Sequence, residues 1–534
     1  MKIINTIRNG FICLSVLFLF AGCNKSVLDE RPTSFLSPEA TLINNAGFQS
    51  AIASLHQGTR EILIGSYNQY WSLFYGTDIG SIGVMDAPLR DYSTTLTPTF
   101  AGVDFFWEWG YLTMLPRANE IIVYAQKPGV TWKNDAEKNA VIAEARFFRG
   151  YVLNFLTNLY GDIPIVDTVI TAPKVDYHKN TRKEVLQFAA ADLEFASQWL
   201  PLTESQPGRI VKNAADHLLS EVYISLGNYD KAIAAAGSVI TSGRNQLMRQ
   251  RFGSLKSQPG DVFSDMFKDG NQNRASGNTE NLWVVQFEFQ TPGGVNSAGG
   301  KPWLRTWGAR YFDAKDPNNG SGMVLADSLG RGVSQMRPNN HVLYEIWDDP
   351  NDIRNSSYNI RRKWYYNNPA SAYYKQEVKY HSRLDTLYHI YPSFIKIEGL
   401  DLGGVSLGRT FNDWPVMRLP ETYLLRAEAY LRKGDLQKAA DDINVVRARA
   451  QAAPVTVDKV SLDYILDERL RELIIEEPRR LTLSRMGMLV ERTKKYNGFP
   501  LTVSTIQDKN EFFPIPQKFI DANFGFKIVQ NPGY

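Results

Sequence analysis

The chain has almost no cysteine, with only Cys13 and Cys23 among its 534 residues. Both lie within the first 23 residues, so the remainder of the chain contains no thiol at all. This absence excludes disulfides, thiolate zinc sites and a cysteine nucleophile from the folded body. The body must therefore be stabilised by burial alone, and its length is sufficient for one large core or two.

An excess of charge of one sign is also missing. The chain carries 59 Lys and Arg against 56 Asp and Glu, a net charge of +3. The balance falls to about +1 if Lys2 and Arg8 are removed with an export signal. A nucleic-acid-binding protein would show a dominant basic surface, so we expect no nucleic-acid partner.

Motifs for catalysis and metal binding are scarce as well. The six histidines show no His-Glu-x-x-His or paired ligand spacing, and no glycine-rich phosphate cradle or serine elbow is present. Residues 269–273 are similar to a calcium loop but lack the closing bidentate Glu, so we expect a turn there. We therefore expect no cofactor, with a structural calcium as the open alternative. A glycosidase carboxylate pair is defined by its separation in space, which a sequence does not show.

The N-terminal apolar run, Phe11 to Ala21, is too short to span a bilayer permanently. It follows basic residues and ends in Gly22-Cys23, an order typical of an export signal. Ala21-Gly22-Cys23 is similar to a bacterial lipobox, although Phe20 stands where Leu is usual. We expect residues 1–22 to be a removed signal peptide and Cys23 to be the acylated first residue. An ordinary secretory signal with an incidental cysteine is the alternative.

Helical periodicity dominates residues 37–245, after a polar tether expected over residues 23–36. Ser37-Pro38-Glu39 is typical of a helix start. One predicted helix face comprises Val141, Ala145, Phe148, Val152, Phe155 and Leu159. We expect this helix to stop at residues 160–164.

Two distant segments share one pattern of small residue, aromatic, turn glycine, large residue and alanine. The first contains Ser220, Tyr223, Gly227, Tyr229 and Ala232, and the second contains Ala427, Tyr430, Gly434, Leu436 and Ala439. Equal offsets of this kind indicate tetratricopeptide-type helix-turn-helix units. We therefore expect a helical scaffold built from residues 37–245 and 411–534, with residues 246–410 inserted into it.

The inserted segment is rich in Gly, Asn, Asp and Pro, which indicates loops. One strand is predicted over residues 281–289, where Trp283, Val285, Phe287 and Phe289 alternate. Further on, Leu462, Leu466, Leu470 and Leu473 predict a helix face. We interpret Glu468 with Glu472, and Glu476 with Arg480, as solvated charges on the other sides of that helix, worth about 0.2–0.5 kcal/mol a pair.

Several short motifs follow one another along nearly the whole chain, and their number and order are specific although no single motif is decisive. They are Leu28-Asp29-Glu30 with Pro32, Gly76-Thr77-Asp78, residues 143–147 (AEARF), residues 159–164 (LYGDIP), Gly208-Arg209 ahead of Ala214-Ala215, residues 418–429 (RLPETYLLRAEA), Glu468-Arg469 and residues 530–534 (QNPGY). In these residues the chain resembles the SusD/RagB family of outer-membrane nutrient-binding lipoproteins of Bacteroidetes.

The resemblance implies a mostly α fold, with a tetratricopeptide-type helical scaffold packed on an irregular, loop-rich ligand-binding lobe that contains a few short strands. It implies a non-catalytic lipoprotein, held in the cell outer membrane by its lipid and facing the cell exterior. The implied partners are an oligosaccharide and a SusC-like TonB-dependent outer-membrane barrel that receives it. Glu144, Arg146, Arg426 and Glu428 lie among apolar helical residues, so we interpret them as structural partners and not as ligand contacts.

A sugar-binding surface needs flat aromatic rings flanked by polar side chains. The sequence offers this mixture in the loop after Asp78, with Arg90, Asp91 and Tyr92, and the family generally places ligand contacts near that motif. A second stretch contains Trp303, Trp307 and Tyr311, for which a short helix burying one aromatic stripe is an equally good interpretation. Trp347, beside Asp348 and Asp349, is a further candidate.

Three other functions stay open at this point. The chain could be a lipid-anchored surface glycoside hydrolase, a receptor of the same type for peptides, or a scaffold that binds only proteins. The preferred hypothesis is a non-catalytic oligosaccharide receptor, because binding requires no proton donor or nucleophile and no motif for either is present.

Overall fold

The computed structural model describes residues 37–64, 70–84, 89–291, 294–295 and 299–534. The predicted signal peptide, Cys23 and the tether therefore lie outside the described residues. Within the described part of the chain, no helix combines the length and the apolar composition needed to cross a bilayer.

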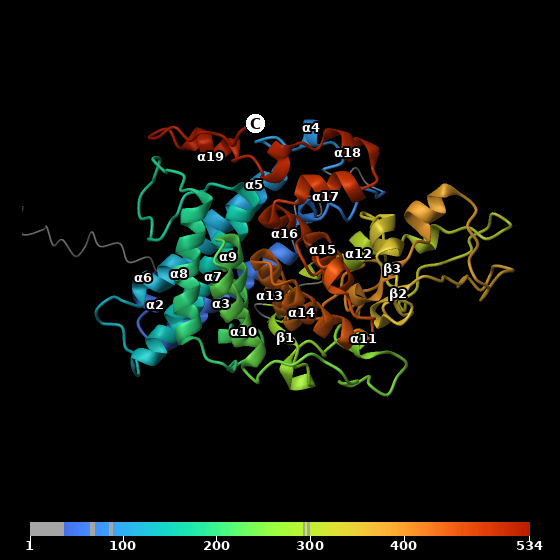
Figure 1. The fold of residues 1–534 in the computed structure, drawn as a ribbon, viewed down its shortest axis with the longest axis horizontal. Coiled ribbons are helices and arrows are strands. Elements are labelled where there is room, and N and C mark those ends of the chain that lie inside the picture. Colours follow the sequence, from blue (N-terminus) through green and yellow to red (C-terminus); the bar gives the residue numbers. More distant parts are fainter. Residues whose placement is uncertain (1–36, 65–69, 85–88, 292–293, 296–298) are drawn as a thin grey trace, which may run out of the picture.

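Helices from the first half of the chain form one side of the molecule (Figure 1). They are α2 (Pro38–Thr41), α3 (Asn45–Ile64), α5 (Ala101–Glu108), α6 (Leu115–Tyr124), α7 (Asp135–Tyr160), α8 (Arg182–Trp199), α9 (Lys212–Ser225) and α10 (Tyr229–Thr241). The 3-10 turn η2 (Tyr70–Leu73), the short helix α4 (Tyr92–Thr95) and the π-helical turn η3 (Trp109–Met114) complete this part.

Helix α7 is the central helix of this side. The Asn134 side chain caps it by accepting a hydrogen bond from the Glu137 amide at 2.9 Å. Its predicted face, from Val141 to Leu159, is buried against α3, α6, α8 and α16 (Arg479–Met486). The helix ends at Gly161, whose φ of 76° is accessible at low cost only to glycine, as the sequence predicted.

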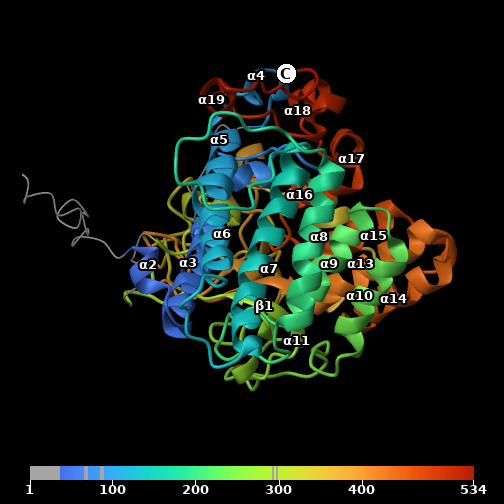
Figure 2. The same ribbon diagram turned by 90° about the vertical axis from the view of Figure 1, so that its left-hand side faces the viewer.

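The two helix-turn-helix units lie side by side although about two hundred residues separate them in the sequence. Helix α10 packs on α13 (Leu419–Lys433), which pairs with α14 (Leu436–Arg449), and Figure 2 shows the four helices α9, α10, α13 and α14 together. The turn glycines Gly227 and Gly434 have φ of 74° and 85°. His217 of α9 contacts the Thr422 hydroxyl of α13 at 2.8 Å. Helices from both halves of the chain therefore pack against one another, while the division into domains stays a prediction.

The C-terminal part continues over the top of the molecule. Its helices are α15 (Leu462–Leu473), α16, α17 (Leu489–Tyr496), α18 (Pro500–Thr505) and α19 (Gln517–Ala522), with 3-10 turns η11 (Val457–Lys459) and η12 (Asp508–Glu511). The final residues close on the end of α7, because the Asn531 side-chain amide donates to the Tyr160 and Phe513 carbonyls at 2.7 Å each.

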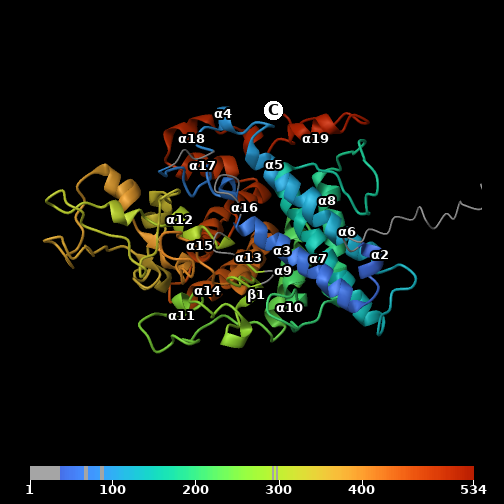
Figure 3. The ribbon, with the colours of Figure 1, turned by 180° about the vertical axis from the view of Figure 1, so that it is seen from behind.

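The segment between the two units forms an irregular lobe that projects away from the helices (Figures 1 and 3). Its elements are α11 (Val262–Asp265), η4 (Arg274–Ser276), β1 (Asn281–Val285), α12 (Trp303–Trp307), η6 (Tyr311–Asp313), η7 (His341–Glu345), η8 (Ile353–Asn355), β2 (Ile360–Arg361), η9 (Asp385–His389), β3 (Ser393–Phe394) and η10 (Ile395–Ile397). The lobe is loop-rich, as expected, while the exact boundaries at residues 245 and 410 stay a prediction.

Strand β1 is antiparallel to β4 (Trp414–Arg418), with Asn281 opposite Arg418 and Val285 opposite Trp414. The second small sheet pairs β2 with β3. The predicted strand over residues 281–289 is too long by four residues, because β4 supplies partners only as far as Val285. Residues on both faces of β1 are buried, although the alternating apolar residues had predicted one buried face.

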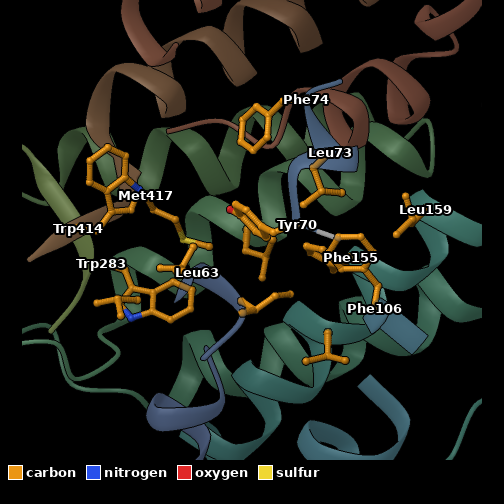
Figure 4. Close-up of a cluster of buried hydrophobic side chains, with 14 of the residues drawn as sticks. Leu63, Tyr70, Leu73, Phe74, Phe106, Phe155, Leu159, Trp283, Trp414 and Met417 are labelled. Carbon is orange, nitrogen blue, oxygen red and sulfur yellow. The ribbon is translucent and has the colours of Figure 1, made fainter. Parts of the chain in front are cut away.

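A large aromatic core joins the lobe to the helices (Figure 4). Tyr70 lies at its centre, between Phe155 of α7 and the β1–β4 pair that carries Trp283 and Trp414. The Trp283 ring meets Phe147 edge to face at 5.5 Å between centroids. Edge-to-face contacts of this kind add about 0.5–1.5 kcal/mol each to the hydrophobic contribution of burial.

Glu468, Glu472, Glu476 and Arg480 are buried and not solvated, so that interpretation was wrong. Glu468 and Glu472 have no exposed surface, because η8 and the end of β4 cover them. Arg354 donates to Glu468 at 2.8 Å and Arg418 donates to Glu472 at 2.8 Å. Glu476 pairs with Arg418 and Lys396 instead of Arg480. Arg480 donates to the Ser72 carbonyl at 2.8 Å.

Candidate functional site

The charged helical residues of the family-like motifs pair with other side chains of the protein. Glu144 of α7 pairs with Arg209, and Glu428 of α13 pairs with Arg485 at 2.6 Å. Arg426 pairs with Asp442 at 2.7 Å, and Arg146 lies 3.8 Å from Asp192. These four helical residues are structural partners, as the sequence interpretation held.

Asp78 also belongs to the interior and not to a ligand surface. It is fully buried, and its carboxylate accepts from Arg479 at 2.9 and 2.7 Å and from Arg492 at 2.9 Å. Burial by itself would raise the pKa of Asp78, but the two guanidinium groups outweigh it and hold that pKa far below its ordinary value. With its oxygens used in this way, Asp78 cannot bind a sugar hydroxyl, and its assignment as a ligand contact is corrected.

The residues after Asp78 have different environments. Tyr92 is buried and donates to the Gly76 carbonyl at 2.6 Å, so its ring presents no face to solvent. Asp91 caps α4 by accepting from the Ser93 amide at 2.9 Å. Arg90 is half-buried and donates to the Ser81 carbonyl at 2.9 Å. Of these three candidates, Arg90 and Asp91 keep exposed surface, and ligand binding by them stays a prediction.

The aromatic stripe of residues 303–311 is buried, so the interpretation as a short core helix holds. Trp303 stacks on Trp414 at 5.4 Å between centroids, and Trp307 meets Phe74 edge to face at 5.4 Å. Tyr311 stacks on Trp364 and donates to the Gly330 carbonyl at 2.7 Å. A covered ring cannot stack on a sugar, so the ligand assignment of these three rings is corrected.

The possible calcium loop is a turn. Asp269 accepts from the Leu400 amide at 3.0 Å, and Gly270 adopts φ of 79°. Across the described residues, no group of three or more His, Cys, Asp or Glu side chains is arranged to hold a metal ion.

Trp347 contacts the turn η7, which lines an open hollow. Its indole donates to the Val342 carbonyl at 2.9 Å and so supports the π-helical turn η7 from behind. The Asn339 side chain starts this turn by accepting from the Val342 amide at 3.0 Å. The same side chain donates to the Asp78 and Tyr496 carbonyls at 2.7 and 2.6 Å. η7 is thereby fixed to the buried Asp78 region and to the end of α17.

A hollow of about 680 Å³ lies beside η7, and we call it the Tyr344 hollow. Its lining residues come from the loop after Asp78, from η7, from the η9 region and from the end of α17: Ile82, Arg337, Asn339, Asn340, His341, Tyr344, Glu345, Arg383, Thr386, Leu387, Lys495, Tyr496, Asn497 and Gly498. The Arg337 amide donates to the Ile82 carbonyl at 2.8 Å, which joins the loop after Asp78 to the lobe. The volume of the Tyr344 hollow is in the range of small-molecule sites.

Tyr344 gives this hollow a half-exposed ring, and Tyr380 lies near Tyr344 without lining the hollow. Tyr344 is 48% exposed and Tyr380 is 54% exposed. The Arg362 guanidinium lies 5.6 Å from the centroid of the Tyr344 ring. Burial lowers the pKa of Arg337, and the nearby phenol groups of Tyr344 and Tyr380 oppose that shift. Rings of this kind can stack on the apolar face of a sugar while the polar neighbours replace the hydroxyl hydrogen bonds lost to water.

Sequence reasoning missed Tyr344 and Tyr380 although the signal was present. Residues 339–347 combine Asn, His, Tyr, Glu and Trp, the mixture sought elsewhere. Trp347, a further candidate in the sequence, is half-buried and its indole donates to the Val342 carbonyl, and ligand binding by it stays a prediction.

Comparison with protein families gives two matches. A family described as "SusD family" matches residues 304–534, and one described as "Starch-binding associating with outer membrane" matches residues 89–224. Together they include parts of the helical scaffold and of the lobe.

Individual proteins are similar over nearly the full length. "SusD-like protein P2" of Formosa agariphila is 27% identical over 97% of this chain and 98% of its own. A SusD homolog from Bacteroides thetaiotaomicron aligns with a TM-score of 0.70 at 18% identity, covering 93% of this chain and 98% of its own. Surface glycan-binding protein A from the same species, solved in complex with laminarihexaose, aligns at 0.67 and 18% identity, covering 91% and 99%.

These alignments confirm a mostly helical fold with a few short strands, as predicted. Residues 304–534 thus match the SusD family, and the fold is that of SusD-like proteins over nearly the full length of the chain.

Proposed function

We propose that the protein is a non-catalytic cell-surface receptor that binds oligosaccharides at the Tyr344 hollow. The observation that carries this proposal is the half-exposed Tyr344 ring, which lines an open hollow of about 680 Å³ together with Asn340 and Glu345. Arg362 lies outside the lining, 5.6 Å from the centroid of that ring. A relative of the same fold has been solved with laminarihexaose, which supports a carbohydrate ligand.

The proposal includes a lipid anchor on Cys23 and delivery of the ligand to a SusC-like TonB-dependent outer-membrane barrel. Family membership supports both, and one matching family is described as associating with the outer membrane. The anchor and the barrel are tested together by purifying the native protein from outer membranes. Mass spectrometry of the N-terminal peptide should show an acylated Cys23, and a large barrel protein should co-purify.

Glycan binding is tested with the full mature protein and a panel of oligosaccharides in isothermal titration calorimetry. Tyr344→Ala and Tyr380→Ala should each weaken binding by about fivefold to a hundredfold, because stacking a ring is worth about 1–3 kcal/mol including its buried area. Tyr374→Ala, at another half-exposed tyrosine of the lobe, is the matched control and should change nothing. Undiminished affinity in both Tyr344→Ala and Tyr380→Ala would refute this site.

The same samples separate receptor from hydrolase. Oligosaccharides recovered after prolonged incubation should be of unchanged length. Shortened products would favour the glycoside hydrolase, and retention of peptides without glycans would favour a peptide receptor.

A further inference from the structure

Most buried arginines pair with carboxylates, although the fully buried Arg480 donates to the Ser72 and Tyr75 carbonyls and the Tyr92 hydroxyl. Arg418 contacts Glu280, Glu472 and Glu476, and Arg354 contacts Asp352 and Glu468. In the hollow of about 660 Å³ between α3, residues 205–209 and β1, Arg209 is paired with Glu144, while Arg60 donates to the Gln286 carbonyl at 3.4 Å.

Two arginines near Tyr344 depart from this pattern: Arg337, which lines the Tyr344 hollow, and Arg362, which lies beside the Tyr344 ring outside the lining. Arg337 donates to the Thr386 and Pro338 carbonyls at 2.9 Å and to the Asn340 side chain at 3.1 Å. All three acceptors are neutral. Arg362 donates from Nε and one terminal nitrogen to the Asn355 side-chain oxygen, at 3.0 and 2.6 Å. Neither guanidinium has an ion pair with a carboxylate of the described residues.

Arg383 adds a third positive charge at the rim of the hollow. Its side chain is exposed and forms no ion pair within the described part of the chain. The neighbouring acids already have cationic or imidazole partners. Asp463 and Asp467 pair with Arg492, while Glu345 lies 3.3 Å from His341. The surface around Tyr344 therefore carries positive charge without an equal number of free carboxylates.

The excess of positive charge near Tyr344 is costly because Arg337 and Arg362 are partly removed from water. Desolvation lowers the pKa of Arg337 and of Arg362, and only tyrosine phenols, not carboxylates, oppose the shift. A guanidinium removed from water without a partner anion is costly, and a ligand anion would remove that cost. The second terminal nitrogen of Arg362 has no hydrogen-bond partner in the described residues, which leaves its N–H groups available to a ligand.

We infer that the Tyr344 hollow is selective for anionic oligosaccharides, in which a carboxylate or sulfate group pairs with Arg362 and Arg383 while a sugar ring stacks on Tyr344. This inference rests on the proposed glycan-binding function of the same hollow. Arg337 is almost fully covered, so it attracts the ligand anion by its positive charge and not by direct contact.

Three hexasaccharides test the inference: hexagalacturonate with carboxylates, a carrageenan hexasaccharide with sulfate esters, and neutral laminarihexaose. Binding to the full mature protein is measured by calorimetry at about 50 mM and about 500 mM salt, where screening differs severalfold. At least one anionic ligand should bind about tenfold or more tighter than laminarihexaose at low salt, and the difference should shrink at high salt.

Arg362→Gln and Arg383→Gln should each weaken binding of the anionic ligand by about threefold to thirtyfold, with little change for laminarihexaose. Arg249→Gln is the matched control, because Arg249 is exposed, forms no ion pair in the described residues and does not line the hollow. Arg383 is exposed, so its variant keeps the test valid if Arg362→Gln fails to fold.

Tight binding of hexagalacturonate alone identifies carboxylate as the recognised group, and tight binding of the carrageenan alone identifies sulfate. Either result supports the inference. If laminarihexaose binds as tightly as both anions and depends on Tyr344, the inference is overturned while the proposed function stands. If no oligosaccharide binds, the proposed function fails and the inference fails with it.

Discussion

Replacing Glu472 by Gln tests the strongest correction that the structure makes to the sequence interpretation. Glu472 has no exposed surface, and its carboxylate accepts from Arg354 at 3.1 Å, from Arg418 at 2.8 Å and from Arg449. Glutamine keeps one acceptor oxygen but replaces the other with an amide donor that faces guanidinium N–H groups. The variant therefore removes a buried negative charge and introduces a contact between donors.

The two interpretations predict very different magnitudes. Solvated charges on a helix surface contribute about 0.2–0.5 kcal/mol a pair. Breaking a buried ion pair by removing one partner costs about 3–5 kcal/mol, because the remaining charges stay buried without compensation. Since three arginines share Glu472, we expect Glu472→Gln to lower the free energy of unfolding by about 3–5 kcal/mol.

Urea unfolding of the full mature protein, followed by tryptophan fluorescence, measures this difference. Trp283, Trp303 and Trp414 are buried in the core and report its exposure. Glu61→Gln is the matched control, because Glu61 lies on the exposed side of α3 and accepts only from Gln57 at 2.9 Å. The control should change stability by less than about 0.5 kcal/mol. A loss below about 1 kcal/mol in Glu472→Gln would refute the buried network as a source of stability.

The pH dependence gives an independent check. Burial alone would raise the pKa of Glu472, but Arg449, Arg418 and Arg354 outweigh it and hold that pKa far below the ordinary 4.5. A depressed pKa in the folded state contributes stability that is complete above pH 4.5 and is lost as the pH falls towards the folded value. The stability difference between the native protein and Glu472→Gln should therefore be constant near pH 7 and shrink below pH 4.5. An unchanged difference at low pH would contradict the assignment.

Three further predictions use the same assays. Trp303→Ala should cost about 3–5 kcal/mol of unfolding free energy, and its folded fraction should bind oligosaccharide with unchanged affinity, because the ring is core and not ligand platform. Gly434→Ala should lower the free energy of unfolding by about 1–2 kcal/mol, and because no atom lies near the added Cβ, this loss comes from the φ of 85° alone. Gly237→Ala within helix α10 should instead raise the free energy of unfolding by about 0.5–1 kcal/mol. Cys23→Ala should abolish incorporation of labelled fatty acid into the protein, and continued labelling would refute lipidation at that residue.

The helical scaffold was predictable because its signals are local. Small residues such as Ser220 and Ala427 at fixed distances from a turn glycine describe one helix pair at a time, and the equal offsets identified the two units as partners. Ser220 is fully buried and donates to the Ala232 carbonyl at 3.0 Å, which is the close helix contact that a small residue permits.

The buried network was not predictable because its partners are distant. Glu472 has the periodicity of an exposed helix position, and the residues that cover it, Arg354 and Arg418, come from the lobe and from the end of β4. Whether an aromatic ring is buried also depends on residues that are distant in the sequence. Trp303 and Tyr344 have similar polar neighbours in the sequence, yet Trp303 is covered by Trp71 and Trp414 while Tyr344 stands at an open turn.

The unbalanced arginines make sense when these two observations are combined. The fold neutralises Arg418 and Arg354 with glutamates even where those glutamates must be fully desolvated. It leaves Arg337, in the lining of the Tyr344 hollow, and Arg362, beside the exposed Tyr344 ring, with neutral acceptors. Solvent can compensate part of that charge in the free protein, whereas a ligand that excludes water must supply its own anion or lose affinity. The charge pattern thus disfavours neutral oligosaccharides as well as favouring acidic ones, and selectivity follows from both effects.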